Sequence, residues 1–162
     1  MAETDIVHED STLRIGVTRN LVAFAWSGAP EATHIRSLTR ALQTVIGKHG
    51  ANHAALDIVL SGTPRFSDEV RTEMVKLIRD PRIQGQGSAH VVEVTGLSGT
   101  AVRAFLSTVL LMGRPAAPHK VFGNLAAGAA WLAPVLSKEG QAWTPAEILK
   151  AAAAVSAPRK AR

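Results

Sequence analysis

The segment from Ala54 to Asp80 constrains the fold more than any other part of this sequence. Residues Ala54 to Leu60 form an apolar run, and a Gly and a Pro follow it closely. A short aliphatic run bounded in this way is typical of a strand that is buried on both faces of a sheet. A helical pattern then starts at Ser67 and stops at an Asp-Pro pair. The segment therefore predicts a central strand, a turn and a covering helix.

The rest of the chain alternates between strand-like and helix-like segments. Alternating apolar residues predict two opening strands, 12–17 and 21–26, joined by a tight turn at Arg19-Asn20, since Asn tolerates a positive φ. Further strands are predicted over 89–94 and 119–122, and helices over 30–47, 67–79, 102–112, 125–136 and 144–156. Because single helices between strands require parallel pairing, we expect an α/β fold. The order ββαβαβαβα plus a C-terminal helix predicts a mixed, mostly parallel five-stranded sheet with an antiparallel N-terminal hairpin and helices packed on it.

The length of 162 residues is enough for one domain with a single sizeable core. We expect a flexible acidic N-terminus over 1–11, the α/β domain over 12–138, an appended C-terminal helix over 139–156 and a basic tail over 157–162. The absence of Cys removes disulfides and thiolate chemistry, and it fits the cytoplasmic location that we expect. Residues 1–12 lack the apolar region of a signal peptide, and we expect no transmembrane segment.

The net charge of +5 permits weak attraction to nucleic acid or anionic lipid. The Lys and Arg residues are, however, scattered singly and are not interleaved with aromatic residues. We therefore expect solvated surface cations and no nucleic-acid partner.

Three segments, together with the order of the predicted elements, carry a resemblance to a known family. They are LVAFAWSG at 21–28, the strand–turn–helix over 56–67, and Val121-Phe122 followed by a helix that contains AAWL at 129–132. Over about residues 12–136 the chain resembles the STAS domain of anti-sigma-factor antagonists and sulfate-transporter tails, and stand-alone bacterial STAS-like proteins grouped with CRAL-TRIO lipid-binding domains. The resemblance implies a non-catalytic regulatory or scaffolding protein that binds another protein. The alternative that it implies is a small-molecule or lipid-binding domain with a pocket between sheet and helices.

In anti-sigma-factor antagonists, a partner kinase phosphorylates a Ser that opens the helix after the central strand, and the matching position here is Ser67. The usual Asp-Ser-Ser-Gly run is missing, and two carboxylates follow the Ser and would repel a phosphate. An ordinary N-cap Ser is the favoured alternative. The candidate partner-binding residues around it are Pro64, Arg65, Phe66, Asp68 and Arg71.

The aromatic residue of that segment, Phe66, has two interpretations. It is either an exposed anchor beside a cation, as in a binding hot spot, or a staple that packs on the stem of Arg71 or on Met74.

Gly96 to Thr100 lies between a predicted strand and a predicted helix, where backbone N–H groups can bind an anion. Ser98, Gly99 and Thr100 are therefore candidate anion or ligand residues. The favoured alternative is that Ser98 or Thr100 caps the helix.

No residues have the spacing of a catalytic or metal-binding set. His90 is interpreted as a structural side chain on a strand. We therefore expect no catalytic residues, no metal, no cofactor and no enzymatic activity. The sequence leaves open whether the protein forms a homo-oligomer.

Overall fold

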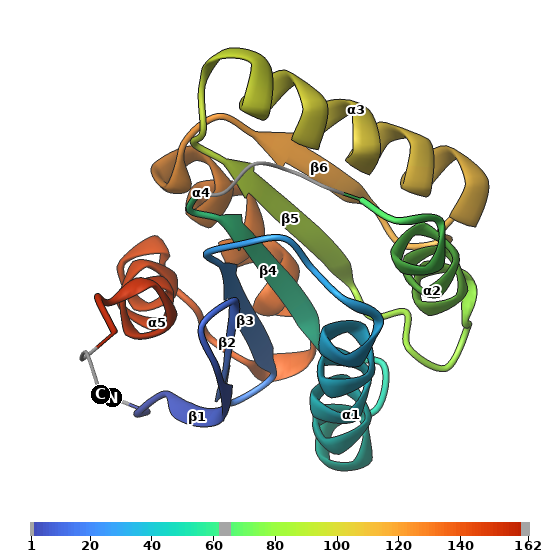
Figure 1. Ribbon diagram of the computed structural model, residues 1–162. Coiled ribbons are helices and arrows are strands. Elements are labelled where there is room, and N and C mark those ends of the chain that lie inside the picture. The colour runs from blue at the N-terminus through green and yellow to red at the C-terminus, as the bar shows by residue number, and fades with distance from the viewer. Residues whose placement is uncertain (1, 62–65, 160–162) are drawn as a thin grey trace.

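The central apolar run forms strand β4 (Ala54–Val59), which lies inside a six-stranded sheet. The protein is described by a computed structural model that covers residues 2–61 and 66–159. The strand order in the sheet follows the chain, from β1 to β6. The pairs β1–β2 and β2–β3 are antiparallel, and every pair from β3 to β6 is parallel (Figure 1). The predicted α/β class, with its antiparallel N-terminal hairpin and mostly parallel remainder, is confirmed.

The structure has these further elements: β1 (Asp5–Glu9), β2 (Leu13–Thr18), β3 (Leu21–Trp26), α1 (Ala32–His49), α2 (Asp68–Arg79), β5 (Gly87–Val92), α3 (Gly96–Gly113), β6 (His119–Phe122), α4 (Leu125–Leu136), the 3-10 turn η1 (Lys138–Gly140) and α5 (Pro145–Ser156).

The sheet has one strand more than the five predicted, because the acidic N-terminal segment is not an unstructured lead-in. Residues Asp5–Glu9 pair with β2 as an edge strand, with a β-bulge between Ile6 and His8. Most of β1 is exposed. The backbone hydrogen bonds to β2 hold this strand in place, and hydrophobic patterning cannot detect a strand that buries so little.

The predicted turn between β2 and β3 forms at Arg19-Asn20, but for a different reason. The positive φ, 49°, belongs to Arg19. Asn20 is fully buried, and its side chain makes two hydrogen bonds. Its Nδ2 donates to the carbonyl of Leu136, and its Oδ1 accepts from Nε1 of Trp143. The Asn therefore ties the hairpin to the C-terminal part of the chain.

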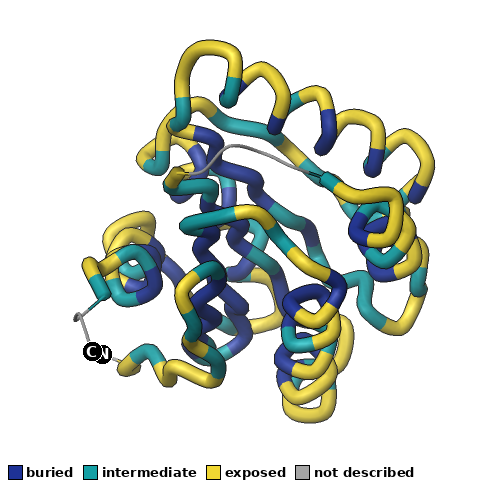
Figure 2. Tube along the Cα trace, in the orientation of Figure 1, coloured by how far each residue is buried: buried dark blue, intermediate teal, exposed yellow. Residues whose placement is uncertain are grey.

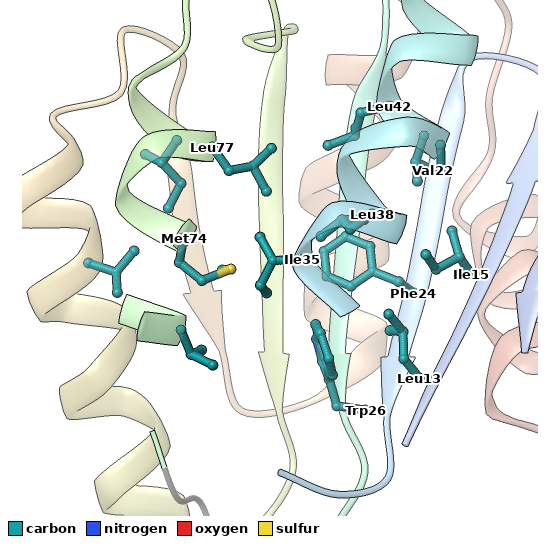
Figure 3. Packing of buried hydrophobic residues seen from close by; sticks show 14 of the residues in the cluster. Leu13, Ile15, Val22, Phe24, Trp26, Ile35, Leu38, Leu42, Met74 and Leu77 are labelled. Carbon is teal, nitrogen blue, oxygen red and sulfur yellow. The ribbon is translucent and has the colours of Figure 1, made fainter. Parts of the chain in front are cut away.

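Two helical layers enclose the sheet. Helices α1, α2 and α3 cover one face, because each crossover from β3 to β6 moves one strand in the same direction (Figure 1). Helices α4 and α5 return to cover the opposite face. On the first face, apolar side chains of β2 and β3 meet those of α1 and α2; Figure 3 labels Leu13, Ile15, Val22, Phe24, Trp26, Ile35, Leu38, Leu42, Met74 and Leu77.

The predicted burial of β4 on both faces is confirmed. Leu56 and Ile58 point into the α4–α5 layer, and both are at most 2% exposed. Ala55 and Val59 pack on the α1–α3 layer. The central strand therefore contributes to both cores.

Candidate functional site

The candidate partner-binding segment lies only in part within the described residues, because Pro64 and Arg65 fall outside them. Phe66 is half-buried, and its ring stacks on Phe105 of α3 with the ring centroids 3.7 Å apart and the planes at 6°. The exposed-anchor interpretation of Phe66 is therefore wrong. The ring packs inward on α3 and on the apolar cluster that includes Met74, one of the two contacts predicted for a staple.

Ser67 is the N-cap of α2. Its side chain accepts a hydrogen bond from the backbone N–H of Val70 at 3.1 Å, as the favoured alternative requires. Asp68 and Arg71 follow it on the surface and form an ion pair, with Nη1 to Oδ1 at 3.1 Å. This geometry explains a Ser at position 67 without a phosphate, so phosphorylation stays a prediction.

The candidate anion residues lie inside α3 rather than in a loop before it. The helix starts at Gly96 after the N-cap Thr95, so the prediction that Ser98 or Thr100 caps it is wrong; the Thr100 hydroxyl donates to the carbonyl of Gly96 instead. Gly99 is buried, and a Cβ there would clash with the carbonyl oxygen of Val94. Close packing explains this glycine.

The strand order provides no topological switch point near these residues. In open α/β sheets a ligand crevice forms where the strand order reverses. Here the order from β1 to β6 has no reversal. The anion-site interpretation of Ser98, Gly99 and Thr100 therefore gains no support from the topology.

A hydrogen-bonded chain of buried side chains crosses four neighbouring strands on the α1–α3 face. Nε1 of Trp26 donates to Oδ1 of Asp57 at 3.1 Å. Nδ1 of His90 lies 2.8 Å from Oδ2 of the same carboxylate. Nε2 of His90 and Nδ1 of His119 share a hydrogen bond of 3.0 Å. Sequence reasoning missed this chain, although a carboxylate inside the apolar run 54–60 was a signal for it.

The Asp57 carboxylate has a partner on each oxygen. Asp57 and His90 are each 4% exposed, Nε1 of Trp26 donates to Oδ1, and Nδ1 of His90 lies at hydrogen-bond distance from Oδ2. A buried polar group needs such partners to offset its loss of hydration. At the other end of the hydrogen-bonded chain, burial and the neighbouring His90 lower the pKa of His119 to about 4. His119 is therefore neutral at pH 7.

His119 by itself is a weak base at neutral pH. An efficient general base has a pKa near the working pH, and that of His119 lies well below it. Within residues 2–61 and 66–159, no hydroxyl group hydrogen-bonds to Asp57, His90 or His119. The chain positions the imidazole of His119, whose Nε2 has no hydrogen-bond partner among the described residues.

Two small cavities flank the chain beneath α1, α2 and α3. The first has a volume of about 50 Å³ and aromatic walls that include Trp26, Phe66 and Phe105. The second has about 70 Å³ and a more polar wall that includes Gln84, Ser88, His90 and His119. Each is large enough for a few water molecules or a ligand of similar size.

Asp57 and Met74 line both cavities, so these two side chains separate them. A Met side chain has three rotatable bonds and adapts to its surroundings. Met74 is therefore a flexible part of the wall that the two cavities share.

The outward side of α3 forms an uncharged surface, which we call the α3 face: Leu97, Ala101, Ala104, Thr108 and Leu111. All five residues are exposed, and the two leucines are 91% and 77% exposed. Figure 2 shows this exposed side along the whole helix. The predicted core stripe of the same helix, which includes Val102 and Val109, is buried as expected.

The only ionisable side chain of α3 points away from this face. Nη2 of Arg103 donates to the carbonyl of Val92, at the end of β5. Among the described residues, α3 is the one helix that could cross a membrane by its length and composition, and 33% of it is buried within the protein. Sequence reasoning assigned only the core stripe of this helix and missed the exposed one.

Searches of family models, curated proteins and solved structures found no match to this chain.

Proposed function

We propose that this protein is a non-catalytic, STAS-like regulatory or scaffolding domain that binds another protein through the α3 face. The exposure of Leu97 and Leu111 on an uncharged helix surface carries this proposal. A surface helix of a monomeric protein usually presents polar and charged residues to water. A contiguous exposed apolar surface marks an interaction site.

The start of α2 packs on the buried side of α3. The stacking of Phe66 on Phe105 fixes the start of α2 against α3, and Ser67 and Asp68 are exposed beside it. A phosphate on Ser67 would add about −1.5 to −2 charges at the start of α2, and the Phe66–Phe105 stack is the contact through which this change would reach α3.

A substitution pair tests the proposed surface. In Leu97→Lys/Leu111→Lys, two cations interrupt the α3 face without touching the core, so we expect an unchanged melting temperature and loss of the bound protein. The matched control is Leu149→Lys on α5, where the side chain is 36% exposed. Binding by affinity purification should persist in this control. Equal recovery of the bound protein by the double variant and the wild type would refute the proposal.

A second candidate function is binding of a small ligand in the cavity beside His119. Within the described residues, Nε2 of His119 has no hydrogen-bond partner, while Gln84 and Ser88 line the same cavity. These groups suit a small neutral molecule with one hydrogen-bonding group and a short apolar part. Titration of ¹⁵N-histidine-labelled protein with short-chain amides and alcohols should shift the His119 ring signals. Ring signals unchanged at saturating concentrations would reject this candidate.

A further inference from the structure

We propose that the partner of the α3 face is a second copy of this chain, with the two α3 helices packed antiparallel across a twofold axis at Ala104. This inference rests on the proposed function and names its partner. Three independent features of the surface support it: the spacing of the exposed residues, the equal separation of the two leucines from Ala104, and the distribution of charge around them.

The spacing matches that of a helix–helix seam. Leu97, Ala104 and Leu111 are seven residues apart, and Ala101 and Thr108 are also seven apart. An apolar or small residue repeated every 3.5 positions keeps one side of a helix facing a partner helix. The buried stripe on the opposite side of α3 already faces the sheet and α2. A second seam on an exposed side therefore indicates a second helical neighbour.

The two leucines of the α3 face lie seven residues on either side of Ala104, and the residues of the face between them are small. In an antiparallel pair centred on Ala104, the leucine at each end of one helix meets the leucine at the opposite end of the other. The small residues between them allow the helix axes to approach closely. A surface with this symmetry is self-complementary, as a twofold interface requires.

The charges at the two ends of α3 favour the antiparallel direction. Glu93 is exposed just before the start of the helix, where its Oε1 accepts a hydrogen bond from the backbone N–H of Leu125. Arg79 and Arg114 are exposed at the end of the helix. Nη2 of Arg79 donates to the carbonyl of Met112, which keeps this cation at the end of α3. Antiparallel pairing brings the acidic end of each helix next to the basic end of the other. Parallel pairing would place like charges together, which disfavours association.

The size of the α3 face determines how strongly two copies should bind each other. The 18 residues of α3 extend over about 27 Å at 1.5 Å per residue. A single helix pair of this length buries less than the roughly 800 Å² per partner of a standard stable interface. We therefore expect a dimer that dissociates on dilution.

Sedimentation velocity over about a hundredfold range of protein concentration tests the dimer. The mass should rise from the 17.1 kDa of the monomer toward twice that value. Ala104→Glu places two carboxylates face to face at the axis, so this variant should stay monomeric with an unchanged melting temperature. The control Ala153→Glu changes an exposed residue of α5 and should dimerise like the wild type.

Cysteine crosslinking tests the geometry, because the chain has no Cys of its own. Under mild oxidation, Ala104→Cys should form a disulfide dimer faster than Ala153→Cys. An antiparallel pair also requires that Leu97→Cys crosslinks to Leu111→Cys in a mixture faster than either variant does alone. Equal crosslinking rates at positions 104 and 153 would overturn the proposal, as would a wild-type protein that stays monomeric at every concentration.

Other occupants of the α3 face give distinct results. Cosedimentation of a monomeric wild type with phosphatidylserine–phosphatidylcholine vesicles, lost in Ala104→Glu, would overturn the second-copy proposal in favour of a membrane surface. A monomeric wild type that binds a different protein, lost in Leu97→Lys/Leu111→Lys, would overturn the second-copy proposal while the proposed function stands.

Discussion

Oδ2 of Asp57 lies 2.8 Å from Nδ1 of His90, and both residues are 4% exposed within the sheet. The strand register causes this contact, because the two residues are direct partners in the parallel pair of β4 and β5. The contact extends through Trp26 on one side and His119 on the other. A polar chain therefore crosses the sheet on its α1–α3 face, and its integrity should control the stability of the sheet.

The first prediction concerns the carboxylate of this chain. Asp57→Ala leaves the N–H groups of Trp26 and His90 buried without acceptors, so we expect a loss of about 3 kcal/mol in the free energy of unfolding. Asp57→Asn, which keeps an acceptor oxygen, should lose less. Urea denaturation followed by tryptophan fluorescence measures both. Equal stability of the wild type and Asp57→Ala would show that the chain makes no net contribution.

The second prediction is a pH dependence of stability that comes from His119. Its folded pKa of about 4 lies below the ordinary value of 6.5. Between these pH values the unfolded chain binds a proton that the folded protein does not bind. The stability that depends on a neutral His119 is therefore fully present above pH 6.5 and is lost as the pH falls toward 4. The free energy of unfolding should fall by up to about 3 kcal/mol, at 1.4 kcal/mol per pKa unit.

The variant His119→Gln isolates this effect from the other histidines. The difference in the free energy of unfolding between the variant and the wild type should change between pH 6.5 and pH 4 and stay constant above that range. A constant difference across the whole range would contradict the lowered pKa of His119.

The third prediction concerns the link between the hairpin and the C-terminal part of the chain. Asn20→Ala removes the acceptor of Trp143 and the donor to Leu136, whose polar groups are then left unpaired. We expect a loss of about 1–3 kcal/mol for such buried groups. Urea denaturation of Asn20→Ala measures the loss. The exposed substitution Gln43→Ala in α1 is the control and should leave stability nearly unchanged.

The fourth prediction separates the two interpretations of Ser67. As an N-cap, Ser67→Ala should lower the free energy of unfolding by about 1 kcal/mol, while Ser67→Asp should retain it because Asp also caps helices. As a regulatory position, Ser67→Asp should weaken binding through the α3 face, which affinity purification measures. Full binding by Ser67→Asp together with a destabilised Ser67→Ala would assign the residue to capping alone.

Local sequence determined most of the elements and their order. The aliphatic run at 54–60 predicted β4, and the Ser67 N-cap predicted the start of α2, because burial period and capping depend on neighbouring residues. The order of strands and helices then predicted a largely parallel sheet. Strand β1 was not predicted, because it forms by pairing with β2 and has no apolar pattern of its own.

Only the tertiary structure determined which residues form the candidate site. About 30 residues separate Asp57 from His90 in the sequence, and about 30 more separate His90 from His119. Parallel pairing of three strands brings these side chains into one hydrogen-bonded row. The residues of the α3 face are visible in the sequence, but their exposure follows from the placement of α3 with its other side against the sheet and α2. Local periodicity specifies which side chains share one side of an element. Packing and strand register between distant segments specify which of those sides meets protein and which meets water.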